Sequence, residues 1–173
     1  MTTLPVHHPL RRLFSGLTEH AFMSILGVTE PRLIDYLSEL LARFLHSDAV
    51  YRLRDSAGKS ISDVPEMIRE AESLPATGST RREYHRHIGD FTLFWIGIFP
   101  EAIRQRQTGW SRDTFISYVA MGKRSYYIAS TFEEGRFAEE VPILRRLSSD
   151  FEMCAYGLNQ VRKEFDTLHV PVE

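Results

Sequence analysis

Side chains that could do chemistry are densest between residues 81 and 90. The run Arg81-Arg82-Glu83-Tyr84-His85-Arg86-His87 is followed by Asp90, about one helical turn further along. Glu83, His87 and Asp90 are separated by steps of four and three, so on a helix their side chains share one face. A row of carboxylate, imidazole and carboxylate can hold a metal ion or orient a general base.

The rest of the sequence does not support a metal site at this row. Metal sites in helical bundles usually combine Glu-x-x-His motifs from several helices. The chain has no such motif and no second helix that carries carboxylates together with histidine. We therefore interpret His87 as a histidine at the edge of the core, and we predict no metal ion and no cofactor. A metal or haem pocket formed by His87 or His85 beside Trp95 and Tyr84 is the weakest alternative.

Arg82 and His87 form a second pattern, an arginine followed after four intervening residues by a histidine. This pattern resembles the signature of the HEPN-domain ribonucleases, which are also small α-helical bundles. The resemblance covers six residues and the fold class. It implies a site formed across a dimer, with His87 as the acid/base and Arg82 holding the scissile phosphate.

Two features depart from that signature. The residue after the arginine is Glu83, where the family usually has Asn, Asp or His. On a straight helix the side chains of Arg82 and His87 point about 140° apart, at about 100° per residue. Arg82 and His87 are nevertheless the candidate catalytic residues of the chain.

The stretch with Lys123-Arg124 and Tyr126-Tyr127 mixes basic and aromatic side chains, as surfaces that bind single-stranded nucleic acids do. However, the formal net charge is −2, and acidic side chains supply counter-charge nearby. We interpret these stretches as solvated helix faces, so nucleic-acid binding is not favoured. The candidate binding residues of the chain are Glu83, His85, Asp90, Lys123 and Arg124.

The element that must position the polar cluster is the stretch Phe91–Phe99, in which almost every residue is apolar. A helix that is apolar all round is buried on most sides, so we expect a central buried helix here. Thr80 with Glu83 fits a capping box at its start. Gly89 and Gly97 within it, and Gly122 in a later helix, indicate places where a neighbouring element comes close.

Further helices are expected from Pro9 to about Ile25, from Pro31 to about residue 47, and over residues 63–74 and 111–132. The last predicted helix, about 40 Å long, follows an unbroken apolar seam of steps of three and four, formed by Leu144, Leu147, Phe151, Cys154, Leu158, Val161, Phe165 and Leu168. Residues 50–61 fit a short β-hairpin or an irregular loop equally well. Residues 1–8 read as a loose leader.

These elements predict one all-α domain over residues 1–173, a bundle of five or six helices with at most one short hairpin. The composition, 43% apolar and 25% charged, is typical of soluble globular proteins. The single cysteine, Cys154, lies on the seam and is expected to behave as a small hydrophobic residue. The apolar run is shorter than the roughly 20 residues that span a bilayer, and no targeting segment is visible. We therefore expect a cytoplasmic protein with no membrane association.

The sequence alone selects no reaction and does not decide whether the protein is an enzyme. The long seam and the many aromatic residues, eleven Phe, seven Tyr and two Trp, favour exposed apolar surface that binds a partner. The leading hypothesis is a non-enzymatic helical interaction or assembly module, as a homo-oligomer or with a protein partner. The alternative is a HEPN-like RNA-binding or RNA-cleaving protein that uses Arg82 and His87.

Overall fold

The computed structural model describes residues 8–46, 63–101 and 112–168, and within them the fold is all-α, as predicted. The described residues form seven α-helices, where five or six helices were expected: α1 (Pro9–Glu19), α2 (Pro31–His46), α3 (Val64–Ser73), α4 (Ser79–Ile98), α6 (Arg112–Ser130), α7 (Val141–Ser149) and α8 (Phe151–Leu168). The predicted hairpin at 50–61 lies outside the described residues, as do residues 1–7 of the predicted leader.

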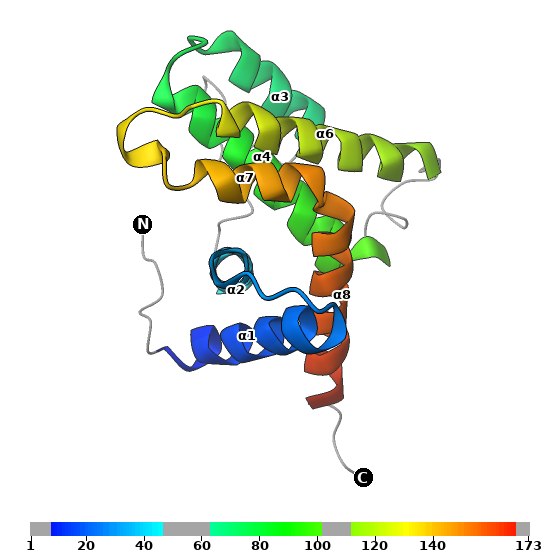
Figure 1. The fold of residues 1–173 in the computed structure, drawn as a ribbon. Helices are drawn as coiled ribbons and strands as arrows, with labels where there is room; N and C mark the ends of the chain where they lie inside the picture. The colour runs from blue at the N-terminus through cyan, green and yellow to red at the C-terminus, as the bar shows by residue number, and fades with distance from the viewer. Residues whose placement is uncertain (1–7, 47–62, 102–111, 169–173) are drawn as a thin grey trace.

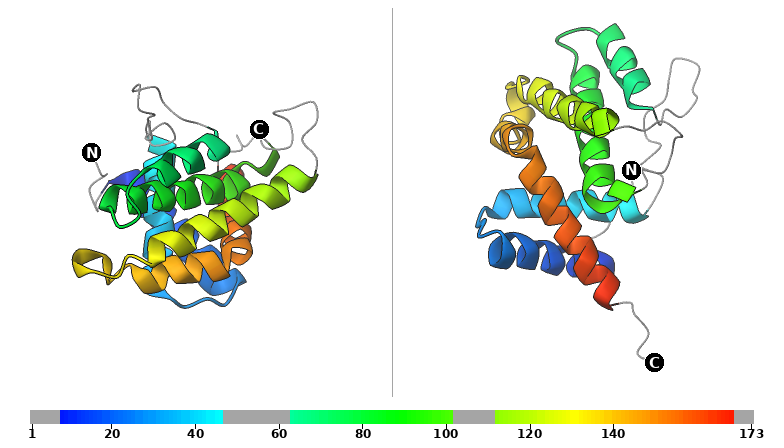
Figure 2. Two further views of the ribbon diagram at one scale, coloured as in Figure 1. Left: turned by 90° about the horizontal axis from the view of Figure 1, so that it is seen from above. Right: turned by 90° about the vertical axis from the view of Figure 1, so that its right-hand side faces the viewer.

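Two groups of helices are joined by two long ones. Helices α1 and α2 lie side by side at one end of the molecule, and α3, α6 and α7 lie at the other (Figures 1 and 2). Helices α4 and α8 run between the two groups, and α4 packs against α3, α6 and α8. Most of the 20 residues of α4 are buried, so α4 is the central buried helix that the sequence predicted.

The helix ends follow local sequence signals, with one correction. His8 caps α1 through its Nδ1 atom, which accepts a hydrogen bond from the Leu10 amide at 3.2 Å, and Pro9 occupies the first turn. After α1 a π-helix (His20–Ile25) leads to Gly27, whose φ of 69° is suited to glycine. The predicted cap at Thr80 is wrong. The cap of α4 is Gly78, whose carbonyl already accepts from the Arg81 amide at 3.1 Å.

The predicted single helix over residues 144–168 is also wrong, because the chain bends at Asp150. This residue has φ −116° and ψ 35°, outside the helical region, and it separates α7 from α8. The apolar spacing continues through the bend, but the partners change: α7 packs mainly on α6, whereas α8 packs mainly on α4. The bend lets one regular seam be buried against two helices with different directions.

Glycines allow α4 to approach its neighbours, as the sequence indicated. A Cβ atom at Gly97 would lie 2.8 Å from the Leu158 side chain of α8. A Cβ atom at Gly122 of α6 would overlap the Thr92 hydroxyl of α4 and the ring of Phe151. Both distances are shorter than a real Cβ contact allows, so these close crossings require glycine.

Candidate functional site

The polar residues of α4 divide into two clusters, and they do not form one continuous row. Asp90 lies deep between α2, α4 and α6, while Arg82 and Arg86 face carboxylates of α4 and of the turn before α7. Glu83, His87 and Asp90, which share a face in the sequence pattern, therefore have different partners in the fold.

Asp90 is the centre of the buried cluster, with an exposed fraction of 1%. Its Oδ1 atom accepts hydrogen bonds from the hydroxyls of Tyr36 at 2.6 Å and Tyr126 at 2.7 Å. Its Oδ2 atom forms an ion pair with Arg43 at 3.1 Å. Both carboxylate oxygens are thus bound by side chains from the helices on either side of α4.

The electrostatics of this cluster keep Asp90 ionised. Burial alone would raise the pKa of the carboxyl, but Arg43, Arg86 and the two hydroxyl donors outweigh it, so the pKa lies below the ordinary aspartate value. Burial, followed by the Asp90 charge, raises the pKa of Tyr36 and Tyr126 well above 10. The tyrosines therefore remain protonated donors to Asp90.

The sequence explains how Tyr126 reaches this carboxylate. Gly89 precedes Asp90 on α4, and a Cβ atom there would lie 2.6 Å from the ring of Tyr126. The missing side chain leaves room for the ring to lie flat against the backbone of α4. The hydroxyl at the end of that ring then lies beside Asp90, one residue further on.

Arg82 and Arg86 form the second cluster, which lies nearer the surface. The Arg82 guanidinium, only 2% exposed, forms ion pairs with Glu83 at 2.5 Å and Glu140 at 2.7 Å, and its central carbon lies 4.2 Å from the ring centroid of Phe137. Arg86 forms an ion pair with Glu140 at 3.0 Å. A hollow of about 390 Å³ lies beside this cluster, and its walls carry two cations and two carboxylates.

His87 packs against aromatic rings of α2 and α4. Its ring is 3% exposed and stacks on Phe44 of α2, with a centroid distance of 5.8 Å, and it also contacts Phe91. The surroundings of Arg82 are the turn before α7, so the two residues of the HEPN-like pattern face different neighbours. RNA binding or cleavage through this pair stays a prediction from the sequence.

The remaining candidate residues lie at the crossing of α4 and α6. His85 is 2% exposed, and its Nδ1 atom lies 3.4 Å from the Ser125 hydroxyl. Burial, with help from the charges of Arg81 and Arg124, lowers the pKa of His85 to about 4. Lys123 forms an ion pair with Glu152, and Arg124 with Glu72, so both cations of the basic-aromatic stretch face a carboxylate.

Two further observations concern chemistry that the sequence raised. Among the described residues, no three His, Cys, Asp or Glu side chains converge closely enough to hold a metal ion. Cys154 is fully buried on α8, and burial raises the pKa of its thiol to about 12. The thiol therefore has the character of a packed core residue, in agreement with its position on the apolar seam.

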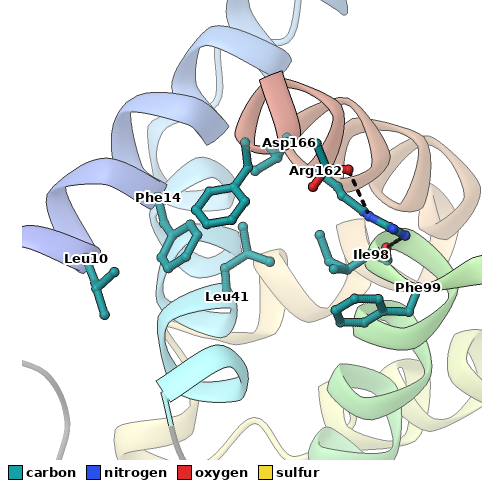
Figure 3. A pocket seen from close by; sticks show the side chains of 9 residues that line it. Leu10, Phe14, Leu41, Ile98, Phe99, Arg162 and Asp166 are labelled. Atoms are coloured by element: carbon teal, nitrogen blue, oxygen red, sulfur yellow. Dashed lines mark hydrogen bonds and ion pairs between the residues drawn. The ribbon is translucent and has the colours of Figure 1, made fainter. Parts of the chain in front are cut away.

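Sequence reasoning missed a groove of about 320 Å³ between α1, α2, α4 and α8, which we call the α1–α8 groove (Figure 3). Seven of its nine lining residues are apolar, and Arg162 and Asp166 stand at one side: Leu10, Phe14, Leu41, Ile98, Phe99, Val161, Arg162, Phe165 and Asp166. The rings of Phe14 and Phe165 stack at 6.0 Å where α1 meets α8.

The apolar spacing along α1 and α8 indicated the two sides of this groove but not that they meet. The apolar stripe of α8 continues from Val161 through Phe165 to Leu168, where the exposed fraction reaches 62%. Leu10, the first member of the stripe on α1, is 38% exposed. The spacing predicted both stripes, but the convergence of α1 and α8 depends on tertiary packing that no local pattern contains.

No family model matches the chain, and no curated protein or solved structure matches it. None of the helices in the described part of the chain has both the length and the apolar character needed to cross a membrane.

Proposed function

We propose that the protein is a non-enzymatic helical interaction module, and that the α1–α8 groove receives an amphipathic helix of a protein partner. The observation that carries this proposal is the groove itself, an apolar hollow of about 320 Å³. Apolar concavities of a few hundred Å³ are typical of ligand-binding sites, and exposed apolar surface usually marks an interaction site. By contrast, Asp90, Arg82 and Arg86 are all engaged in ion pairs with other groups of the chain.

A helix is the occupant that the shape of this surface favours. The walls are helices, and Leu10 of α1, which lines the groove, is 38% exposed. Helix-in-groove recognition places residues i, i+3, i+4 and i+7 of the partner against such a surface. A bound helix would cover Leu10 and the half-buried Phe99 and Phe165 together.

The test uses a fluorescent peptide with leucine at the i, i+3, i+4 and i+7 positions and glutamine elsewhere, and a scrambled peptide of the same composition. We expect the patterned peptide to bind in a fluorescence anisotropy titration and the scrambled peptide not to bind. Leu10→Asp should weaken binding roughly tenfold, because a charge would enter the apolar contact. Ile116→Asp is the matched control, since Ile116 is 55% exposed on α6, away from the groove.

Three results would contradict the proposal. The first is equal binding of both peptides, and the second is equal loss of binding in Leu10→Asp and Ile116→Asp. The third is a dimer, detected by light scattering, that Leu10→Asp dissociates, because this would assign the groove to a second copy of the chain.

A further inference from the structure

Two parts of the molecule together form the α1–α8 groove. Leu10, Phe14 and Leu41 come from α1 and α2, which, with the π-helix between them, we call the α1–α2 unit. The other lining residues come from α4 and α8 and the residue after α4 (Figure 3). We call helices α3, α4, α6, α7 and α8 the body. The groove is therefore complete only while the α1–α2 unit is docked on the body.

The helices of the α1–α2 unit pack mainly on each other. α1 and α2 pack together more extensively than either packs on any helix of the body, whereas α4 packs most extensively on α6. Across the boundary, Phe14 stacks on Phe165 of α8, and an ion pair joins Glu30 to Arg146 of α7. A pair of packed helices is the kind of motif that opens as one cooperative unit without global unfolding. Leu37 of α2 is fully buried, so we expect the open state to be a minor one.

Asp90 is bound from both sides of this boundary. Tyr36 and Arg43 of the α1–α2 unit contact its two carboxylate oxygens at 2.6 Å and 3.1 Å. Tyr126 of the body donates to one of these oxygens at 2.7 Å, and the charge of Arg86 on α4 helps to lower the pKa of Asp90. If the α1–α2 unit moves away, Asp90 loses the first two partners and keeps the other two. Opening therefore leaves no buried charge without compensation, which is the costly case.

We propose that the α1–α2 unit opens from the body as one unit, that its contacts with Asp90 hold it closed, and that a helix bound in the α1–α8 groove holds it closed as well. The last part rests on the proposed function and adds a means of regulating it. A ligand that binds only the closed state shifts the equilibrium toward that state. The Asp90 contacts and the groove thus act on one equilibrium from two sites, which couples them.

Hydrogen exchange of backbone amides, measured by mass spectrometry, tests the opening with a matched pair of substitutions. Tyr36→Phe and Tyr126→Phe each remove one hydroxyl from the same Oδ1 atom of Asp90 and keep the ring. Opening breaks the Tyr36 hydrogen bond but keeps the Tyr126 hydrogen bond. We therefore expect Tyr36→Phe to accelerate exchange in α1 and α2 about tenfold, as suits a lost hydrogen bond to a charged group, and Tyr126→Phe to leave it unchanged.

Two results would overturn the opening. If both variants accelerate exchange equally in all helices, the amides of α1 and α2 exchange only through global unfolding. If Tyr36→Phe leaves exchange in α1 and α2 at the wild-type rate, the contacts with Asp90 do not hold the unit closed.

The leucine-patterned peptide tests the link to the groove. At a free concentration of about 100 times its Kd it should slow exchange in α1 and α2 roughly 100-fold, and the scrambled peptide should not slow it. If the peptide binds in the anisotropy titration but leaves this exchange unchanged, the link is wrong while the interaction function stands. If the peptide does not bind, the proposed function is wrong, and the two tyrosine variants still decide whether the unit opens.

Discussion

At the scale of single residues, Asp90 and His85 are two buried titratable groups that differ in charge. Asp90 is ionised, whereas His85 is neutral. A buried charge that loses its partner destabilises a protein by about 3–5 kcal/mol. Asp90 retains its charge because Arg43 and two tyrosine hydroxyls surround it. His85 has no carboxylate partner among its hydrogen bonds and ion pairs, and the nearby charges of Arg81 and Arg124 are positive, so it is held neutral.

The neutral state of His85 predicts a pH dependence of stability. The pKa of His85 is about 4 in the folded protein, below the value of 6.5 that applies when the chain is unfolded. Between these values the unfolded chain binds the proton and the folded protein does not. We therefore expect stability to fall as the pH drops from 6.5 to about 4, by up to about 1.4 kcal/mol per pH unit, with no contribution from His85 above pH 6.5.

The measurement is urea unfolding of the wild type and of His85→Asn at several pH values, with the difference between the two as the readout. His85→Asn should remove the part of the dependence of unfolding free energy on pH that His85 contributes. His20→Asn is the control for removing a histidine as such, since His20 is exposed. Identical slopes in the wild type and in His85→Asn would contradict the prediction.

At the scale of elements, the crossing of α4 and α6 depends on the absence of a side chain at Gly89. The ring of Tyr126 occupies the space where a Cβ atom would lie, at 2.6 Å. The ring is fully buried, so it cannot swing away into solvent. A side chain at position 89 would therefore push α6 outward and move the Tyr126 hydroxyl away from Asp90.

We expect Gly89→Ala to destabilise the protein by about 1–3 kcal/mol or more, as overpacked core substitutions do. The same substitution at Gly16 should change the free energy of unfolding in the opposite direction. Gly16 lies on the exposed face of α1 with nothing within 4 Å of a Cβ atom, so alanine should stabilise by up to about 1 kcal/mol through helix propensity. Chemical unfolding of both variants measures the two changes, and equal signs would refute the packing argument.

The elements were largely predictable because each has a local signal. The apolar stretch after Phe91 predicted the buried helix α4, and the glycines predicted its close crossings. The bend at Asp150 was missed because the apolar seam keeps its spacing through it. The change of packing partner from α6 to α4 depends on tertiary packing, which the local sequence does not contain. The prediction of a single domain stays a prediction.

The candidate site was less predictable for a related reason. The polar residues of α4 were found by their density, but their partners lie far away in the chain: Tyr36 is 54 residues from Asp90, and Tyr126 is 36 residues from it. Both tyrosines lie in helices whose spacing gives no sign that they meet a common carboxylate. Spacing along one helix cannot distinguish a row of ligands from residues that face three different neighbours.

At the scale of the whole molecule, the residues of the α1–α8 groove should differ in what they contribute to stability. Phe14→Ala should cost about 3–5 kcal/mol, because the ring is 4% exposed and stacks on Phe165. Leu10→Asp should change the free energy of unfolding by no more than about 0.5 kcal/mol, as exposed substitutions do.

Urea unfolding of both variants checks whether Phe14, which is buried in the groove, contributes more to stability than Leu10 at its edge, which we call the rim. A loss of several kcal/mol in Leu10→Asp would mean that the rim is part of the core.

The contacts of Asp90 with Tyr36 and Tyr126 also bear on how long the native state lasts. Contacts within one helix form before contacts between distant parts of a chain, because distant contacts must first overcome the entropy of closing a loop. The three-helix junction at Asp90 consists of such distant contacts, so we expect it to form late in folding, after the rate-limiting step. Interactions made after the rate-limiting step leave the folding rate nearly unchanged and slow unfolding. We expect the buried carboxylate to lengthen the lifetime of the folded protein without making folding faster.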